Sequence, residues 1–226
     1  MLLFLFLPIL KDEQLKILIL LLPTIKMELA SDLYETFEWK NLHPLIRADL
    51  ATIVEGSRKG ANIELFKLER QSVSFFLEQK NNLDKWLKYS GFEYTNRRDD
   101  YYISSDKDLL YELSKGEIKP GEFLGYPECC IKNFEEGCKK YLEGKGKGPA
   151  VNFWLQAKKE KEKGELEPVL EYALHMPCST KCINSIEYTG LQVEAIKEKN
   201  KEAAKALREY NLSLMEKFCK KILEID

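Results

Sequence analysis

Residues 125–130 read GYPECC, and residues 175–182 read HMPCSTKC. Together these two segments hold four of the six cysteines and one of the two histidines of the chain. Each segment places a proline shortly before its first cysteine, and proline is favoured in the first turn of a helix, where its missing N–H costs nothing. The pattern therefore predicts two helix N-termini that carry thiols. We expect these two helix ends to meet in space, because the helix dipole there favours thiolates that one cation can share.

The residue types in the two segments are those that bind metals in proteins. Cys178 and Cys182 are four residues apart, so a helix would place them on one face, with His175 in the preceding loop. Cys129 and Cys130 are adjacent and would point in different directions, so only one of them is expected to bind a single ion. Neither segment has the C-x2-C spacing of a zinc finger. The set nevertheless predicts a Cys3His site for zinc or for an iron–sulfur cluster.

Residues 124–134 (LGYPECCIKNF) and 175–185 (HMPCSTKCINS) resemble the paired motifs of an uncharacterised family of mainly archaeal proteins. In that family a GYP-x-CC segment is followed by an H-x-PC-x3-C segment. The resemblance extends from about residue 42 onward and implies that the two motifs act as one unit, with no assigned activity. The positions that it singles out are Gly125, Tyr126, Pro127, Cys129, Cys130, Phe134, His175, Pro177, Cys178 and Cys182.

Composition limits the classes of partner. The chain of 226 residues carries 35 basic and 37 acidic residues, for a net charge of −2. There is no overall basic excess, so any contact with nucleic acid would have to be local, at Arg97, Arg98 or the glycine–lysine loop at 144–149. Six cysteines are too few for a disulfide scaffold of this length, and free thiols fit a reducing cytoplasm.

The N-terminal residues 1–26 form an apolar leader of uncertain status. Its apolar runs at 1–10 and 17–22 are shorter than the roughly 20 residues that cross a bilayer, so no transmembrane span is expected. The leader also lacks the basic start and cleavage site of a secretory signal. It could be an interfacial anchor, a pair of short buried elements or sequence upstream of the true start. We favour the last interpretation, with Met27 as the native start.

Hydrophobic periodicity and turn residues predict an α+β fold. Residues 27–118 should form a small α+β unit with short antiparallel strands, and residues 119–226 a mainly helical unit that carries the cysteines and His175. In the first unit we expect helices at 28–39, 42–55, 83–89 and 107–114 and strands at 62–68, 92–96 and 101–104, whereas 73–77 fits either type.

In the second unit we expect the GYPECC helix, a short helix at 166–174 and one long helix at 191–225. The apolar stripe of the long helix could pack on the cysteine-bearing helices, or pair with a second copy of the chain as a homo-oligomer. Cys138 and Cys219 are interpreted as small buried hydrophobic residues outside the site.

Three functions remain open from the sequence. The first is a metal-binding protein, in which Glu128 and His175 could act as acid and base beside a zinc-bound water. The second is a thiol enzyme or redox protein, with Cys129 or Cys130 as nucleophile, His175 as base and Cys178 or Cys182 as resolving thiol. The third is a structural or RNA- or protein-interaction module with buried cysteines.

Overall fold

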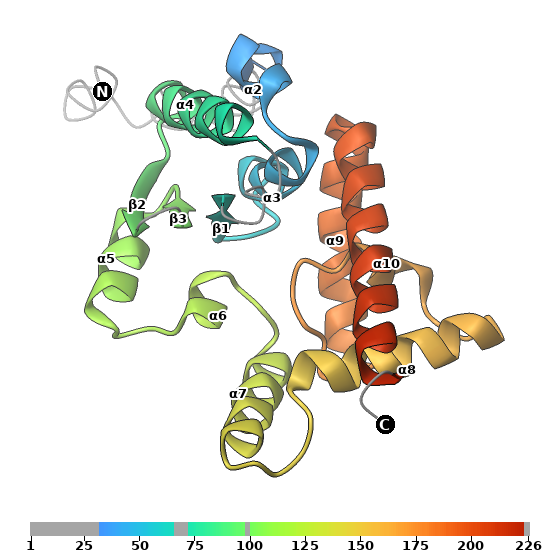
Figure 1. Cartoon of the computed structure of the whole chain (residues 1–226). Helices are drawn as coiled ribbons and strands as arrows, with labels where there is room; N and C mark the ends of the chain where they lie inside the picture. Colours follow the sequence, from blue (N-terminus) through green and yellow to red (C-terminus); the bar gives the residue numbers. More distant parts are fainter. Residues whose placement is uncertain (1–31, 66–71, 98–99, 224–226) are drawn as a thin grey trace, which may run out of the picture.

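The structure is a computed structural model that describes residues 32–65, 72–97 and 100–223. The predicted leader at 1–26, the interpreted start at Met27 and Arg98 lie outside these residues. The elements described below are drawn in Figure 1.

A small antiparallel sheet lies in the first half of the chain. β3 is its middle strand, in the order β1-β3-β2, with Ile63 opposite Tyr101 and Tyr94 opposite Ile103. The antiparallel pairing expected of the strands at 92–96 and 101–104 is therefore confirmed, and the fold is α+β. The elements of this half are α2 (Phe37–Asn41), α3 (Pro44–Val54), β1 (Gly60–Glu64), α4 (Val73–Ser90), β2 (Glu93–Arg97), β3 (Asp100–Ser104) and α5 (Lys107–Lys115).

Helix caps decide several boundaries in this half. The Ser72 hydroxyl accepts a hydrogen bond from the Phe75 amide at 3.3 Å, which starts α4 as a helix where the sequence alone left strand or helix open. Asp106 caps α5, the helix predicted at 107–114, and accepts hydrogen bonds from two backbone amides at 3.0 and 3.2 Å. Gly116 ends α5 with a φ of 74°, a left-handed conformation that glycine adopts without strain.

The second half is helical. Its elements are α6 (Pro120–Phe123), α7 (Glu128–Leu142), α8 (Pro149–Lys163), the 3-10 helix η4 (Pro168–Tyr172), α9 (Ile183–Lys199) and α10 (Lys201–Leu223). Figure 1 shows α9 and α10 side by side, with α8 crossing the far end of α10. The short helix predicted at 166–174 is thus a 3-10 turn that leads into His175.

The prediction of a single long helix at 191–225 is wrong, because the helix is interrupted at Asn200. The backbone of Asn200 leaves the helical region, at φ −152° and ψ 85°, and its side-chain oxygen accepts from the Ala203 amide at 2.9 Å. Asn200 therefore ends α9 and caps α10. The break folds the two helices back on each other, and α10 packs against α3, α8 and α9. Pairing of α10 with a second chain stays a prediction.

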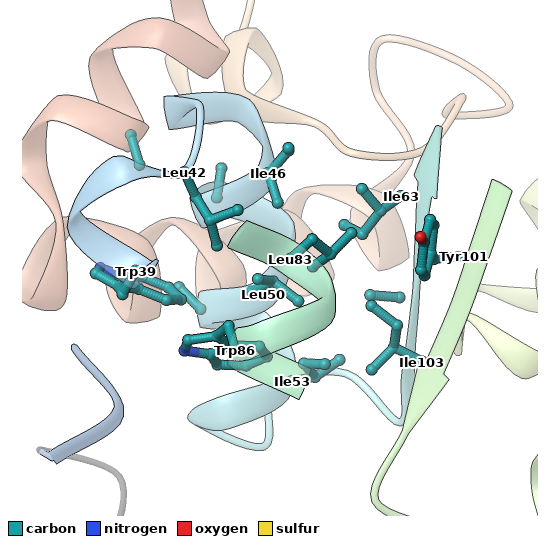
Figure 2. Close-up of a cluster of buried hydrophobic side chains, with 14 of the residues drawn as sticks. Trp39, Leu42, Ile46, Leu50, Ile53, Ile63, Leu83, Trp86, Tyr101 and Ile103 are labelled. Atoms are coloured by element: carbon teal, nitrogen blue, oxygen red, sulfur yellow. The ribbon is translucent and has the colours of Figure 1, made fainter. Parts of the chain in front are cut away.

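The largest hydrophobic core joins both halves of the chain. Figure 2 shows its side chains gathering from α2, α3, α4 and the strands, with the Trp39 and Trp86 rings 5.7 Å apart between centroids. Ile196 of α9 and Ala203 and Leu207 of α10 belong to the same cluster. The helices of the second half are thus anchored on the first, while the division of the chain after residue 118 stays a prediction.

In the part of the chain that the structure describes, no helix combines the length and the apolar composition that crossing a bilayer requires.

Two glycines provide a test of packing, Gly60 beside Phe123 of a smaller hydrophobic cluster and Gly190 on α9. A Cβ on Gly60 would lie 2.5 Å from ring atoms of the fully buried Phe123, whereas a Cβ on Gly190, inside α9, would meet nothing within 4 Å. We expect Gly60→Ala to lower the free energy of unfolding by about 1–3 kcal/mol. Gly190→Ala should raise it by up to about 1 kcal/mol, because alanine is the better helix former. Urea denaturation followed by circular dichroism measures both, and equal stability of the two variants would contradict this packing.

Candidate metal centre

The first cysteine segment starts a helix, as predicted. α7 begins at Glu128, directly after Pro127, and carries Cys129 and Cys130 in its first turn. Gly125, just before, has a φ of 71°, in the left-handed region that favours glycine. The GYP residues therefore form a tight turn between α6 and α7, and this turn fixes where the two thiols emerge.

The second segment is a turn followed by a helix. α9 begins at Ile183 with Cys182 as its N-cap residue, and Cys178 lies in the turn before it. The Cys182 amide donates to the Ser179 carbonyl at 3.3 Å, which closes this turn. The prediction that Cys178 and Cys182 share a helical face is therefore wrong. It is the turn that places their sulfur atoms close together.

Four cysteine sulfur atoms from the two segments lie close together. The Sγ atoms of Cys129, Cys130, Cys178 and Cys182 all lie within 4.8 Å of one another. The Sγ of Cys182 is 3.6 Å from that of Cys129 and 3.9 Å from that of Cys130. Cys130 and Cys182 are buried, and Cys129 and Cys178 are half-buried. A group of this kind could hold a metal ion. We call these four residues the sulfur group.

Both adjacent cysteines belong to the sulfur group, although only one was expected there. Successive side chains of a helix point about 100° apart. In the first turn of α7 this angle still lets the Sγ atoms of Cys129 and Cys130 approach to 3.8 Å.

His175 lies beside the sulfur group and not among its four atoms. Its Nε2 is 2.8 Å from the Ser185 hydroxyl, which is itself 3.0 Å from the Cys130 Sγ. The expected Cys3His set is thus replaced by four sulfurs with a serine between sulfur and imidazole. Burial, and then the positive charge of Arg58, lower the pKa of His175 to about 3, so its ring is neutral at physiological pH. Sequence reasoning missed Ser185, although it stands only three residues after Cys182.

Hydrogen-bond donors surround the sulfur atoms. The Cys178 amide donates to the Cys130 Sγ at 3.3 Å, and the Asn184 side chain donates to the Cys129 Sγ at 3.6 Å. Burial raises the pKa of Cys130 to about 11. Burial also acts to raise the pKa of Cys182, but hydrogen bonds from Ser185 and neighbouring thiols lower it to about 7. One sulfur of the group is therefore poised to ionise, and a bound cation would favour ionisation of the others.

Two tyrosines hold the cysteine segments together. The Tyr126 hydroxyl donates to the Leu174 carbonyl at 3.0 Å, and the Tyr188 hydroxyl donates to the Leu124 carbonyl at 2.8 Å. Tyr126, in the first cysteine segment, thus binds the residue just before the second segment. Tyr188, which follows the second segment, binds the residue just before the first. Both rings also contact the His175 ring, with centroids 5.3 Å away. We call this reciprocal pair the tyrosine clasp. The resemblance singled out Tyr126, but Tyr188 was missed, since nothing in its spacing marks it.

A buried cation connects the clasp to the first half of the chain. Arg58 is 5% exposed, and its guanidinium donates to the Asp49 carboxylate at 2.7 Å. The same guanidinium carbon lies 5.7 Å from the centroid of the Tyr126 ring. A buried cation is stable only with such partners. Arg58 therefore positions the GYP turn against α3, and no pattern in the sequence marked it.

Other candidates lie apart from the sulfur group. Glu128 is exposed and forms an ion pair with Lys132 at 2.6 Å, which lowers the pKa of its carboxyl group. Cys138 is half-buried on α7, and Cys219 is buried on α10. Neither belongs to the sulfur group, as the sequence predicted. Cys219 is buried as expected, whereas Cys138 is less buried than predicted.

The tyrosine clasp can be tested by removing one hydroxyl. Tyr188→Phe leaves the Leu124 carbonyl without its donor, so we expect a loss of about 1–3 kcal/mol in the free energy of unfolding. Tyr141→Phe is the matched control, because Tyr141 is 59% exposed on α7 and should change stability by less than about 0.5 kcal/mol. Thermal unfolding of both variants measures this, and a Tyr188→Phe protein as stable as the control would contradict the clasp.

Comparison with known proteins identifies one matching protein family. No curated protein and no solved structure matches the chain significantly. A family model described as "Protein of unknown function (DUF483)" matches residues 95–211, just over half of the 226 residues. The matched range contains both cysteine segments, the tyrosine clasp and Ser185. The chain belongs to this uncharacterised family, DUF483.

Proposed function

We propose that this protein binds one zinc ion through the thiolates of the sulfur group. Zinc holds each thiolate at about 2.3 Å in a tetrahedron, so sulfur atoms that share one ion lie about 3.8 Å apart. The three sulfur–sulfur distances given above, 3.6, 3.8 and 3.9 Å, fit this value. An iron–sulfur cluster places several iron and sulfide ions between its thiolates and needs them farther apart. The spacing therefore favours a single ion.

The proposed role of the ion is structural. Four protein ligands complete the tetrahedron and leave no position for a reactive water. The ion would fasten the start of α7 to the start of α9, two elements that lie more than 50 residues apart in the chain. The positive ends of the two helix dipoles and the donors Ser185 and Asn184 would offset the negative charge that four thiolates bring.

The thiol-enzyme alternative has less support, because the His175 ring contacts Ser185 and not a sulfur atom. A zinc–thiolate site also suits a reducing compartment such as the cytoplasm, where thiols this close stay unoxidised. We propose that location on this ground.

The zinc proposal predicts metal content. Protein purified under reducing conditions should carry one zinc per chain and no visible colour. Cys130→Ser and Cys182→Ser should lose most of that zinc and unfold at lower temperature, because ligation and folding are coupled. Cys138→Ser is the matched control, since Cys138 lies on the same helix outside the sulfur group. Elemental analysis decides: full zinc in both ligand variants, or stoichiometric iron with visible absorbance in the wild type, would refute the proposal.

A histidine variant separates the four-thiolate site from the Cys3His set. His175→Ala should keep one zinc per chain but bind it about 10–100-fold more weakly, because Ser185 loses the partner that orients it toward Cys130. Competition with a chromogenic chelator measures the affinity. The control is His43→Ala, whose ring caps α3 far from the cysteines in sequence and should leave zinc affinity unchanged. Complete loss of zinc from a folded His175→Ala protein would instead make His175 a ligand.

A further inference from the structure

A groove lies where η4, α9 and α10 meet. It consists of two adjoining cavities of about 320 Å³ and about 330 Å³, which share Tyr172, Lys197 and Arg208 in their lining. None of its lining residues belongs to the sulfur group or the tyrosine clasp. The groove exists because the chain turns at Asn200, which brings the end of α9 and the start of α10 to the same place.

The lining is strongly positive in a protein of net charge −2. Its four cations are Lys197, Lys201, Lys205 and Arg208, and the only carboxylate among its lining residues is Glu171. The three cations of α10 follow a spacing of four and three residues, which places them on one face of the helix. All four cations are exposed, so they form a positive wall open to solvent.

The one carboxylate does not neutralise this wall. Glu171 is buried and accepts from Lys161, which lies outside the groove, and from the Nε of Arg208 at 2.5 Å. It is thus already shared between two cations, and it holds Arg208 in place. Lys205 has an exposed partner, Glu209, at 3.8 Å, and such a surface pair contributes little.

The other end of the groove is apolar and contains a ring. Pro168, Val169 and Val193 line it beside Tyr172, and the Nζ of Lys197 lies 4.6 Å from the centroid of the Tyr172 ring. An apolar wall with an aromatic ring suits a nucleobase, and a row of cations next to it suits phosphates.

We propose that this groove binds a single-stranded nucleic acid, with phosphates along Lys201, Lys205 and Arg208 and a base beside Tyr172. A strand fits better than a free nucleotide, because the exposed walls cannot enclose one small molecule, and the binding energy must come from several phosphate contacts. The site is independent of the proposed zinc ion.

Fluorescence anisotropy with a labelled oligouridylate of about 12 nucleotides tests this, using the full-length protein as purified. Lys201→Ala/Lys205→Ala should weaken binding at least tenfold at low salt. It should also reduce the slope of log K against log salt by about 1.4, since each contact with a single strand contributes about 0.7. The matched control is Lys139→Ala/Lys140→Ala, an equal change of charge at exposed positions of α7, and it should bind as the wild type does.

Three results would overturn the proposal. Equal weakening in the control pair would mean that binding follows overall charge and not the groove. Displacement of the strand by uridine monophosphate or inorganic phosphate at comparable concentration would make the groove a small-phosphate site. Binding of phosphatidylserine vesicles, lost in the groove variant while the oligouridylate fails to bind, would assign it to a lipid headgroup. Zinc content is measured in each lysine variant as well. A variant that loses nucleic-acid binding but keeps its zinc then tests the groove without testing the zinc site.

Discussion

The reciprocal hydrogen bonds of Tyr126 and Tyr188 are the constraint on which the rest of the site depends. They join residues 48 and 64 positions apart in the chain, each to the carbonyl that precedes the other motif. Each bond alone contributes only about 0.5–1.5 kcal/mol, less than the entropy lost in closing loops of that length. The large core, in which Ile196 and Leu207 pack with the residues of α3 and α4, supplies the remaining stability. The clasp then sets the register in which the two cysteine segments meet.

Buried polar groups are concentrated around this clasp. Arg58 and Asp49, His175 and Ser185, and the four thiols lie in one connected region. Burial disfavours the charged forms, which is why the pKa of Cys130 rises to about 11 and that of His175 falls to about 3. A bound zinc ion would reverse this balance for sulfur, because the four cysteines would hold it as thiolates. His175 would stay neutral and act through the Ser185 hydroxyl.

The proposed zinc site and the basic groove depend on the same two helices, α9 and α10, but use different parts of them. The sulfur group lies at the start of α9, where Cys182 is the N-cap residue, and the groove lies at its end. Between them α9 carries the buried side chains of Thr189 and Gln192. A helix anchored at its N-cap residue by the proposed zinc ion would hold its last turn in a fixed position, and this would serve the proposed binding of a nucleic acid at the groove.

The sequence by itself determined the α+β class, the hairpin of β2 and β3 and the helix start at Pro127. It also indicated that the two cysteine segments meet and that Cys138 and Cys219 lie outside the site. These features depend on local rules, such as the cap at Asp106 and the positive φ of Gly116 and Gly125, which act within a few residues.

Only the tertiary structure decided that both Cys129 and Cys130 face the other segment, that Ser185 stands between His175 and sulfur, and that Tyr188 and Arg58 hold the motifs in place. It also decided that the helix predicted at 191–225 is interrupted at Asn200. The apolar stripe continues at helical spacing past this residue, so the sequence pattern did not reveal the turn. The physical reason is the same in each case: these outcomes depend on contacts between residues far apart in the chain, and neither periodicity nor spacing records which side chain a distant segment will meet.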